Sequence, residues 1–275
     1  MEATTSAVAV AAATSTASGL GLAVERVVLL HDANALTLRL LPCDVVARVA
    51  PVAHGTAAFQ LDVAGQLAAV GAPVAAPDPR VEPRVHTRDG LDVTFWTHHA
   101  AVADVSPAAC ADALQRLHAG LRSVRVAAPH VTDRLDEARN LVADRTLSPE
   151  LGEADRDLLA AVLDAARPLL GGLAGREQLL HGEPHPGNVL GTAAGPVVVD
   201  WETCCRGPVE FDLAHAPAEV AAHYPGADPE LLRRCRTLAL ALATTWRWDR
   251  HDTFPDGRRA GRTGLDRLRE TTGGA

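Results

Sequence analysis

Acidic and amide side chains of the kind that phosphoryl transfer requires occur close together between residues 183 and 200. Glu183 is followed five residues later by Asn188, and the apolar run 197–199 ends in Asp200. Phosphoryl transfer needs a base that orients the attacking hydroxyl, and oxygen ligands for a magnesium ion that bridges the nucleotide phosphates. Carboxylate and amide oxygens suit this hard cation, whereas histidine and cysteine suit softer metals. The segment therefore favours magnesium-dependent phosphoryl transfer.

A zinc site is an alternative for the same segment, because His181, Glu183 and His185 alternate along it. The two histidines would come together only on an extended strand, and Pro184 and Pro186 predict a turn instead. The spacing also differs from the His-Glu-x-x-His pattern that places zinc ligands on one helix face. A zinc hydrolase is accordingly the weakest of the three hypotheses for this chain.

The segment from Leu180 to Ala214 resembles the aminoglycoside phosphotransferase family. That family has a catalytic loop reading His-Gly-Asp-x-x-x-x-Asn, a metal-binding Asp after a short hairpin, and a downstream Asp-Leu-Ala. The matching residues here are His181, Gly182, Glu183, Asn188, Asp200 and Asp212. The resemblance implies that Glu183 is the catalytic base and that Asn188 and Asp200 hold Mg2+. It also implies that His181 and Asp212 support the catalytic loop.

Three residues of the first hundred extend the resemblance to the nucleotide. Arg48 matches the phosphate-gripping cation of the third strand, and Asp62 lies in the following helix, where the family has an acid paired to that cation. Asn34 resembles an Asn of the family's phosphate loop. All 26 basic residues of the chain are arginine, so a phosphate-gripping cation must be arginine here. The resemblance implies that ATP or GTP is bound between two lobes and that a small-molecule hydroxyl is the acceptor.

The chain departs from the family pattern at three places. The base position holds Glu183 instead of Asp, the helix acid is Asp62 instead of Glu, and the loop at residues 31–34 lacks glycine. One extra methylene moves a carboxylate oxygen by about an ångström, which can slow a reaction roughly a hundredfold unless the backbone compensates. A catalytically impaired nucleotide-binding module is therefore the second hypothesis.

Hydrophobic periodicity and turn signals predict an α+β chain with a sheet-rich lobe followed by a helical lobe, and the resemblance implies that together they form a two-lobed protein-kinase-like fold. Strands and a helix are expected early in the chain, at 24–30, 35–40, 45–50, 56–70 (the helix), 81–86 and 91–97. Cap signals predict later helices at 106–122, 132–144, 148–170, 228–250 and 258–269, with a short hairpin within 189–199. These elements predict three parts: a flexible leader (1–18), a small antiparallel-sheet N-lobe (19–100), and a larger helical C-lobe (101–275). The resemblance implies that the C-lobe carries the catalytic and metal-binding loops and the acceptor pocket.

Composition narrows the classes of function. The formal net charge is −8 and no basic stripe is present, which argues against binding nucleic acid. No apolar run reaches the roughly 18 residues that a membrane span requires. The five cysteines include no C-x-x-C pair, and Cys204 and Cys205 are adjacent, so neither a zinc ribbon nor a disulfide framework is expected. A reducing cytoplasm is the expected location. The identity of the acceptor is left open.

Overall fold

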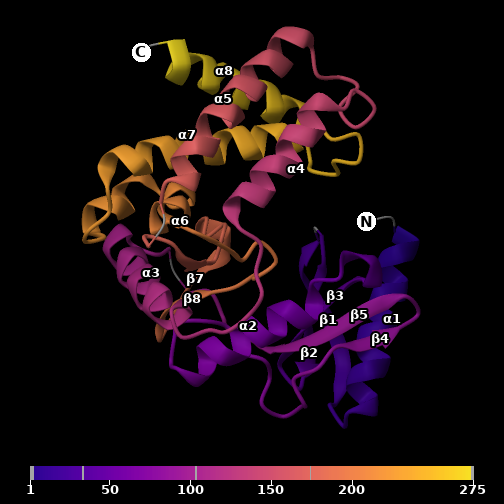
Figure 1. Ribbon diagram of the computed structural model, residues 1–275. Helices are drawn as coiled ribbons and strands as arrows, with labels where there is room; N and C mark the ends of the chain where they lie inside the picture. Colours follow the sequence, from indigo (N-terminus) through magenta and orange to yellow (C-terminus); the bar gives the residue numbers. More distant parts are fainter. Residues whose placement is uncertain (1–2, 33, 103, 174, 274–275) are drawn as a thin grey trace. The chain divides into compact units, whose positions relative to one another are not determined.

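An antiparallel sheet of five strands forms early in the computed structural model, which describes residues 3–32, 34–102, 104–173 and 175–273 (Figure 1). The strand order is β1-β2-β3-β5-β4. The strands are β1 (Val24–Asp32), β2 (Leu36–Pro42), β3 (Val45–Pro51), β4 (His86–Arg88) and β5 (Leu91–Thr97). Alternate residues of β2 and β3 are buried, as the two-residue period of a strand requires. The three consecutive strands predicted from the sequence are confirmed.

Helix α1 (Ala3–Gly19) covers the sheet at the start of the chain (Figure 1). Its buried residues Ala9, Ala12, Ala13 and Ala17 belong to one core cluster with the inward side chains of β2, β3 and β5. The sequence predicted a flexible leader over 1–18, and the structure differs. Nearly every residue of this segment is small or apolar, so no polar face marks the helix, although alanine favours helix formation and permits close approach to a sheet.

Two helices and a hairpin complete the first unit of the chain, which comprises Met1–Val126 and Gly187–Glu202. The helices are α2 (Ala57–Ala69) and α3 (Pro107–Leu121), and the hairpin consists of β7 (Val189–Thr192) and β8 (Gly195–Val198). Backbone bonds attach β8 to the segment after α2, since Val198 donates to Pro73 O and Ala75 donates to Val198 O. The predicted N-lobe ended at residue 100, so the structure assigns one more helix and the hairpin to this unit.

Helices form most of the second unit, Ala127–Pro186 and Thr203–Ala275. They are α4 (Val131–Ala143), α5 (Glu153–Gly171), α6 (Val209–His215), α7 (Pro229–Trp246) and α8 (Gly257–Gly273). The short strands β6 (Gln178–Leu180) and β9 (Cys205–Gly207) pair antiparallel beside them. Short 3-10 turns lie at Val52–His54, in the first unit, at Pro186–Asn188, and at Ala218–His223, in the second unit. Within the described residues, no helix combines the length and the apolar character needed to cross a membrane.

Side-chain caps begin two helices where the sequence predicted them. Ser106 accepts the Ala109 amide of α3, and Asp228 accepts the Glu230 and Leu231 amides of α7. A third expected start was wrong, because Ser148 does not begin α5. The Ser148 hydroxyl donates to the Leu141 and Asp144 carbonyls at the end of α4, so it closes one helix instead of opening the next.

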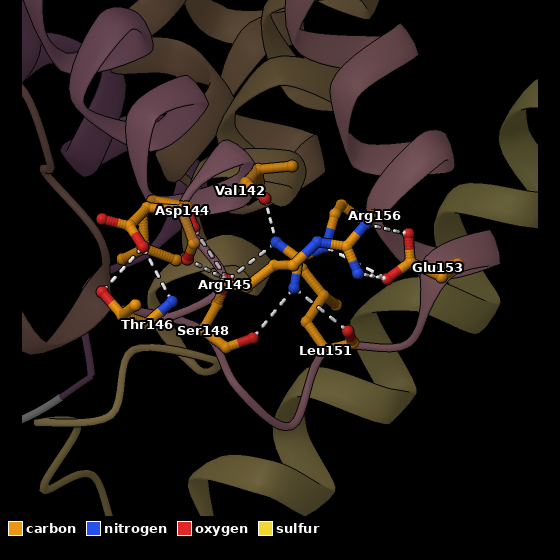
Figure 2. Close-up of polar contacts among 9 residues, drawn as sticks. Val142, Asp144, Arg145, Thr146, Ser148, Leu151, Glu153 and Arg156 are labelled. Carbon is orange, nitrogen blue, oxygen red and sulfur yellow. Dashed lines mark hydrogen bonds and ion pairs between the residues drawn. The ribbon is translucent and has the colours of Figure 1, made fainter.

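The buried Arg156 side chain organises the loop between α4 and α5 (Figure 2). Its guanidinium donates to the Ser148 hydroxyl at 2.9 Å, to the Ser148 carbonyl at 3.0 Å and to the Leu151 carbonyl at 3.2 Å. It also donates to the Val142 carbonyl in the last turn of α4. A cation beside helix carbonyls is favourable because it complements the negative end of the helix dipole. Arg156 therefore provides hydrogen-bond donors to buried acceptors of this loop that water cannot reach.

We expect Arg156→Met to lower the free energy of unfolding by about 3 kcal/mol, because several buried carbonyls lose their donor at once. Arg156→Lys should recover only part of the loss, since an ammonium group lacks the planar fork that serves these four acceptors. Urea unfolding of both variants checks this. Arg145→Met is the control, because Arg145 pairs with Glu153 in the same loop but is exposed. Equal stability of Arg156→Met and wild type would contradict the assignment.

Candidate active site

The Asp212 carboxylate fixes the loop that follows β6. It accepts the His181 amide at 2.9 Å and the Gly182 amide at 2.7 Å, and both Asp212 and His181 are fully buried. Hydrogen bonds from two backbone amides strongly favour the charged form of a carboxylate in the interior. The structure thus places Asp212, on α6, where the sequence predicted a support for the catalytic loop.

The proposed base, Glu183, is half-buried in the next part of this loop. Its amide donates to His181 Nδ1 at 3.2 Å, so His181 contacts the loop through its ring as well as its backbone. His181 therefore contacts the loop that it was predicted to support, and its role there stays a prediction.

His215, at the end of α6, is an uncharged histidine behind the same loop. Its Nε2 is buried and forms no hydrogen bond. Its ring packs against the Phe211 ring in a T-shaped arrangement, with the two ring centroids 5.1 Å apart. Burial lowers the pKa of His215 to about 3, and the nearby Arg134 cation contributes to the decrease. The folded protein therefore resists protonation of this ring.

The sign of this shift predicts that acid destabilises the protein through His215. Below the ordinary pKa of about 6.5 the unfolded chain binds a proton that the folded chain does not, so the free energy of unfolding falls with decreasing pH. The slope approaches about 1.4 kcal/mol per pH unit until the pH nears the folded pKa. Urea unfolding at several pH values between 7.5 and 5 should show a smaller decrease in His215→Phe than in wild type. Parallel curves for the two proteins would contradict the prediction.

In the first unit, an ion pair joins strand β3 to the end of the β7–β8 hairpin. Arg48 Nη1 lies 3.0 Å from Asp200 Oδ1, and the Arg48 side chain is the more buried of the two. Val199 donates to the Asn188 carbonyl at 3.0 Å, which puts Asn188 and Asp200 at neighbouring positions of the hairpin. The fold therefore brings together three predicted site residues that are up to 152 positions apart in the sequence.

Glu202 is a second carboxylate in this cluster, and the sequence analysis did not identify it. Burial raises the pKa of the Glu202 carboxyl, and the Asp200 carboxylate raises it further, whereas Arg48, His54 and the Asn34 side chain lower it. Asn34, in the turn between β1 and β2, thus lies beside the cluster, and its role in a phosphate loop stays a prediction. The sequence could have identified Glu202, because it is an acid two positions after Asp200 with the buried Trp201 between them.

The predicted pair of Arg48 with Asp62 is wrong, because Arg48 pairs with Asp200 instead. Asp62 is an exposed residue of α2, and its carboxylate accepts a hydrogen bond from Gln66 Nε2 at 2.8 Å. The polar side chain on the inward face of α2 is Gln60, whose Oε1 is buried and forms no hydrogen bond. Gln60 precedes the buried Val63 and Ala64 by three and four positions, a helical spacing that could have identified it.

The oxygen donors of this cluster fit a hard divalent cation. Asn188 offers an amide oxygen and Asp200 a carboxylate that is 37% exposed, and Glu202 adds nearby negative charge. Among the described residues, no three or more His, Cys, Asp or Glu side chains gather as they would around a metal ion. Magnesium sites of phosphotransferases commonly use only one or two protein ligands, because the phosphates and water supply the rest.

Known structures share this fold. The choline kinase LicA from Streptococcus pneumoniae is 14% identical with a TM-score of 0.70, covering 95% of this chain and 98% of that chain. A choline/ethanolamine kinase family protein from Mesorhizobium loti is 18% identical with a TM-score of 0.65, covering 90% and 88%. The GDP complex of wild-type aminoglycoside 2'-phosphotransferase-IIIa is 15% identical with a TM-score of 0.66, covering 97% and 99%. At these identities the similarity establishes the fold, and it confirms the predicted α+β architecture.

Sequence comparison identifies the family. No curated protein matches the chain. The model of the phosphotransferase enzyme family, APH, matches residues 25–250, which include the sheet, the Arg48–Asp200 pair and the loop that Asp212 holds. The resemblance drawn from the catalytic-loop residues is therefore confirmed. Because the match spans most of the 275 residues, the chain belongs to the phosphotransferase enzyme family.

Proposed function

We propose that this phosphotransferase moves the terminal phosphate of ATP or GTP to a hydroxyl group of a small molecule. The observation that carries the proposal is the Arg48–Asp200 ion pair at 3.0 Å, beside Asn188 and Glu202. A cation on a central strand and oxygen ligands on the adjacent hairpin are the parts that hold nucleotide phosphates and their metal in phosphoryl transfer. The loop carrying Glu183 supplies the third part, a base held by its backbone.

In this proposal Arg48 contacts the nucleotide phosphates, and Asn34 lies at the turn beside them. Arginine presents a planar fork where lysine presents a point charge, so it can grip two phosphate oxygens at once. Asn188 and Asp200 would hold Mg2+, which neutralises charge on the phosphates when it is bound. Glu183 accepts the proton of the acceptor hydroxyl and orients that oxygen for attack on the terminal phosphate.

A screen of nucleotide-dependent phosphorylation tests the proposal. ATP and GTP would each be offered with magnesium and a panel of hydroxyl compounds, and phosphorylated product would be measured by mass spectrometry. Kanamycin, spectinomycin, choline and ethanolamine belong in the panel, because similar structures are kinases or complexes of these compounds. Product with any member supports the proposal. Tight nucleotide binding without product from a broad panel would favour the second candidate, an impaired nucleotide-binding module, which the Glu183 departure motivates.

Arg48→Ala should weaken nucleotide binding about a hundredfold, because removal of the partly buried guanidinium leaves both the phosphates and Asp200 without their partner. Arg48→Lys should restore only part of the affinity, since it keeps the charge and loses the fork. Calorimetric titration with ATP or GTP in the presence of magnesium measures the change. Arg39→Ala is the matched control. Arg39 lies on the adjacent strand β2 opposite Val46, two positions from Arg48, and pairs with Asp44 instead of Asp200. Unchanged affinity in Arg48→Ala would remove Arg48 from the site.

A further inference from the structure

The peptide that joins Gly182 to Glu183 is held at both of its polar ends. Its carbonyl, on Gly182, accepts a hydrogen bond from Arg134 Nη1 at 3.1 Å, and its amide, on Glu183, donates to His181 Nδ1 at 3.2 Å. Fixing both ends of a planar peptide fixes its rotation, and with it the direction in which the next side chain leaves the backbone. We propose that Arg134 is a positioning residue for the Glu183 carboxylate, an inference that rests on the proposed function.

The loop leaves no room for this peptide to adjust by moving sideways. Gly182 has a φ of +93°, a conformation that side chains rarely adopt, and an added Cβ would lie 1.9 Å from the Thr203 carbonyl oxygen. The Gly182 amide is also held, by Asp212 at 2.7 Å. Rotation of the peptide about its own axis is the freedom that remains, and the Arg134 bond to the carbonyl opposes that rotation.

Arg134 is itself well placed for this role. It lies in the first turn of α4, a helix separate from the loop, and its guanidinium lies 5.9 Å from the centre of the Phe211 ring. The same guanidinium contacts the Cys205 thiol of strand β9. An aromatic ring attracts a cation over its face, and a planar guanidinium presents its donors in a rigid fork. Contacts from α6 and β9 therefore fix the donor that reaches Gly182.

Arginine variants of α4 test the inference by separating turnover from binding. Turnover is measured with ATP or GTP and magnesium, using whichever of kanamycin, spectinomycin, choline or ethanolamine is phosphorylated, or water if none is. We expect Arg134→Met to lower kcat about ten- to a hundredfold while KM for the nucleotide changes less than about twofold, because a misplaced base slows the chemical step. The kcat of Arg134→Lys should lie between those of wild type and Arg134→Met. Arg139→Met is the control, since Arg139 lies on the same helix in an exposed pair with Asp164.

Combination with Glu183→Gln shows whether Arg134 acts through Glu183. If it does, Arg134→Met should add little to the loss that Glu183→Gln already causes, because coupled residues are not additive. Millimolar guanidinium should also raise the kcat of Arg134→Ala without changing its Tm. Full additivity in the double variant, or a wild-type kcat in Arg134→Met, would overturn the inference and leave the proposed function standing. Wild-type turnover in Glu183→Gln alone would instead overturn Glu183 as the base, and the inference with it.

Discussion

Asp200→Asn should lower magnesium-dependent turnover by a factor on the order of 10³ while leaving the protein folded. The expected loss reflects the several kcal/mol of charge stabilisation that a metal ion supplies to phosphoryl transfer. Asparagine keeps the size of the side chain, and its amide oxygen can still accept from Arg48. The backbone should also tolerate the change, because Asp200 has a φ of +68° and asparagine is favoured there. Steady-state rates across a magnesium titration measure the effect.

Asp44→Asn is a closely matched control for this variant. Asp44 also has a positive φ, of 56°, and its carboxylate pairs with Arg39 Nε at 2.6 Å on the same sheet. The Arg39 guanidinium lowers the pKa of Asp44, so the control removes a true ionised partner of an arginine. We expect wild-type turnover in Asp44→Asn. If Asp200→Asn also turns over at the wild-type rate at ordinary magnesium concentration, Asp200 is not a metal ligand.

Local sequence signals predicted most of the secondary structure because the elements bury one regular face. Strands β2 and β3 alternate buried and partly buried residues, and α7 begins at an Asp followed by Pro. The failures have a common physical origin, which is that tertiary contacts decided the outcome. Ser148 carries a cap signal, but the α4 carbonyls and Arg156 use its hydroxyl. Helix α1 carries no periodic signal, and packing on the sheet determines its structure.

The candidate site was predictable where its chemistry lies in one stretch of sequence, as in the loop from His181 to Asn188. Residues that join the site through the fold were not. Glu202 required the hairpin to bring it to Arg48, and Arg134 required α4 to pack beside the loop. The pairing of Asp62 with Arg48 rested on the family resemblance, and it was wrong because Asp62 is an exposed residue of α2 that accepts a hydrogen bond from Gln66. Gln60 and Asp62 differ in the face of α2 that they occupy, since Gln60 is buried and Asp62 is exposed.

Glu183, which we propose as the base, stands where the family has Asp, and the structure bears on what that departure means. A loop that merely tolerated a longer side chain would not need to hold the peptide before it so closely. Here the amides of His181 and Gly182, the Gly182 carbonyl and the Glu183 amide all have partners. A fully bonded backbone is the condition for placing a carboxylate within a fraction of an ångström. We therefore infer that the loop is adapted to glutamate.

Shortening the base should consequently reduce activity. Glu183→Asp draws the carboxylate back by about an ångström and should slow turnover roughly ten- to a hundredfold. Glu183→Gln should be at least as damaging, because it keeps the length and cannot accept the proton. Nucleotide affinity should change little in either variant, and Glu219→Gln, an exposed residue of the same unit, should match wild type in both measurements. A rise in turnover in Glu183→Asp would show that the loop still suits aspartate and would favour the impaired module, since only an unadapted loop gains from the shorter acid.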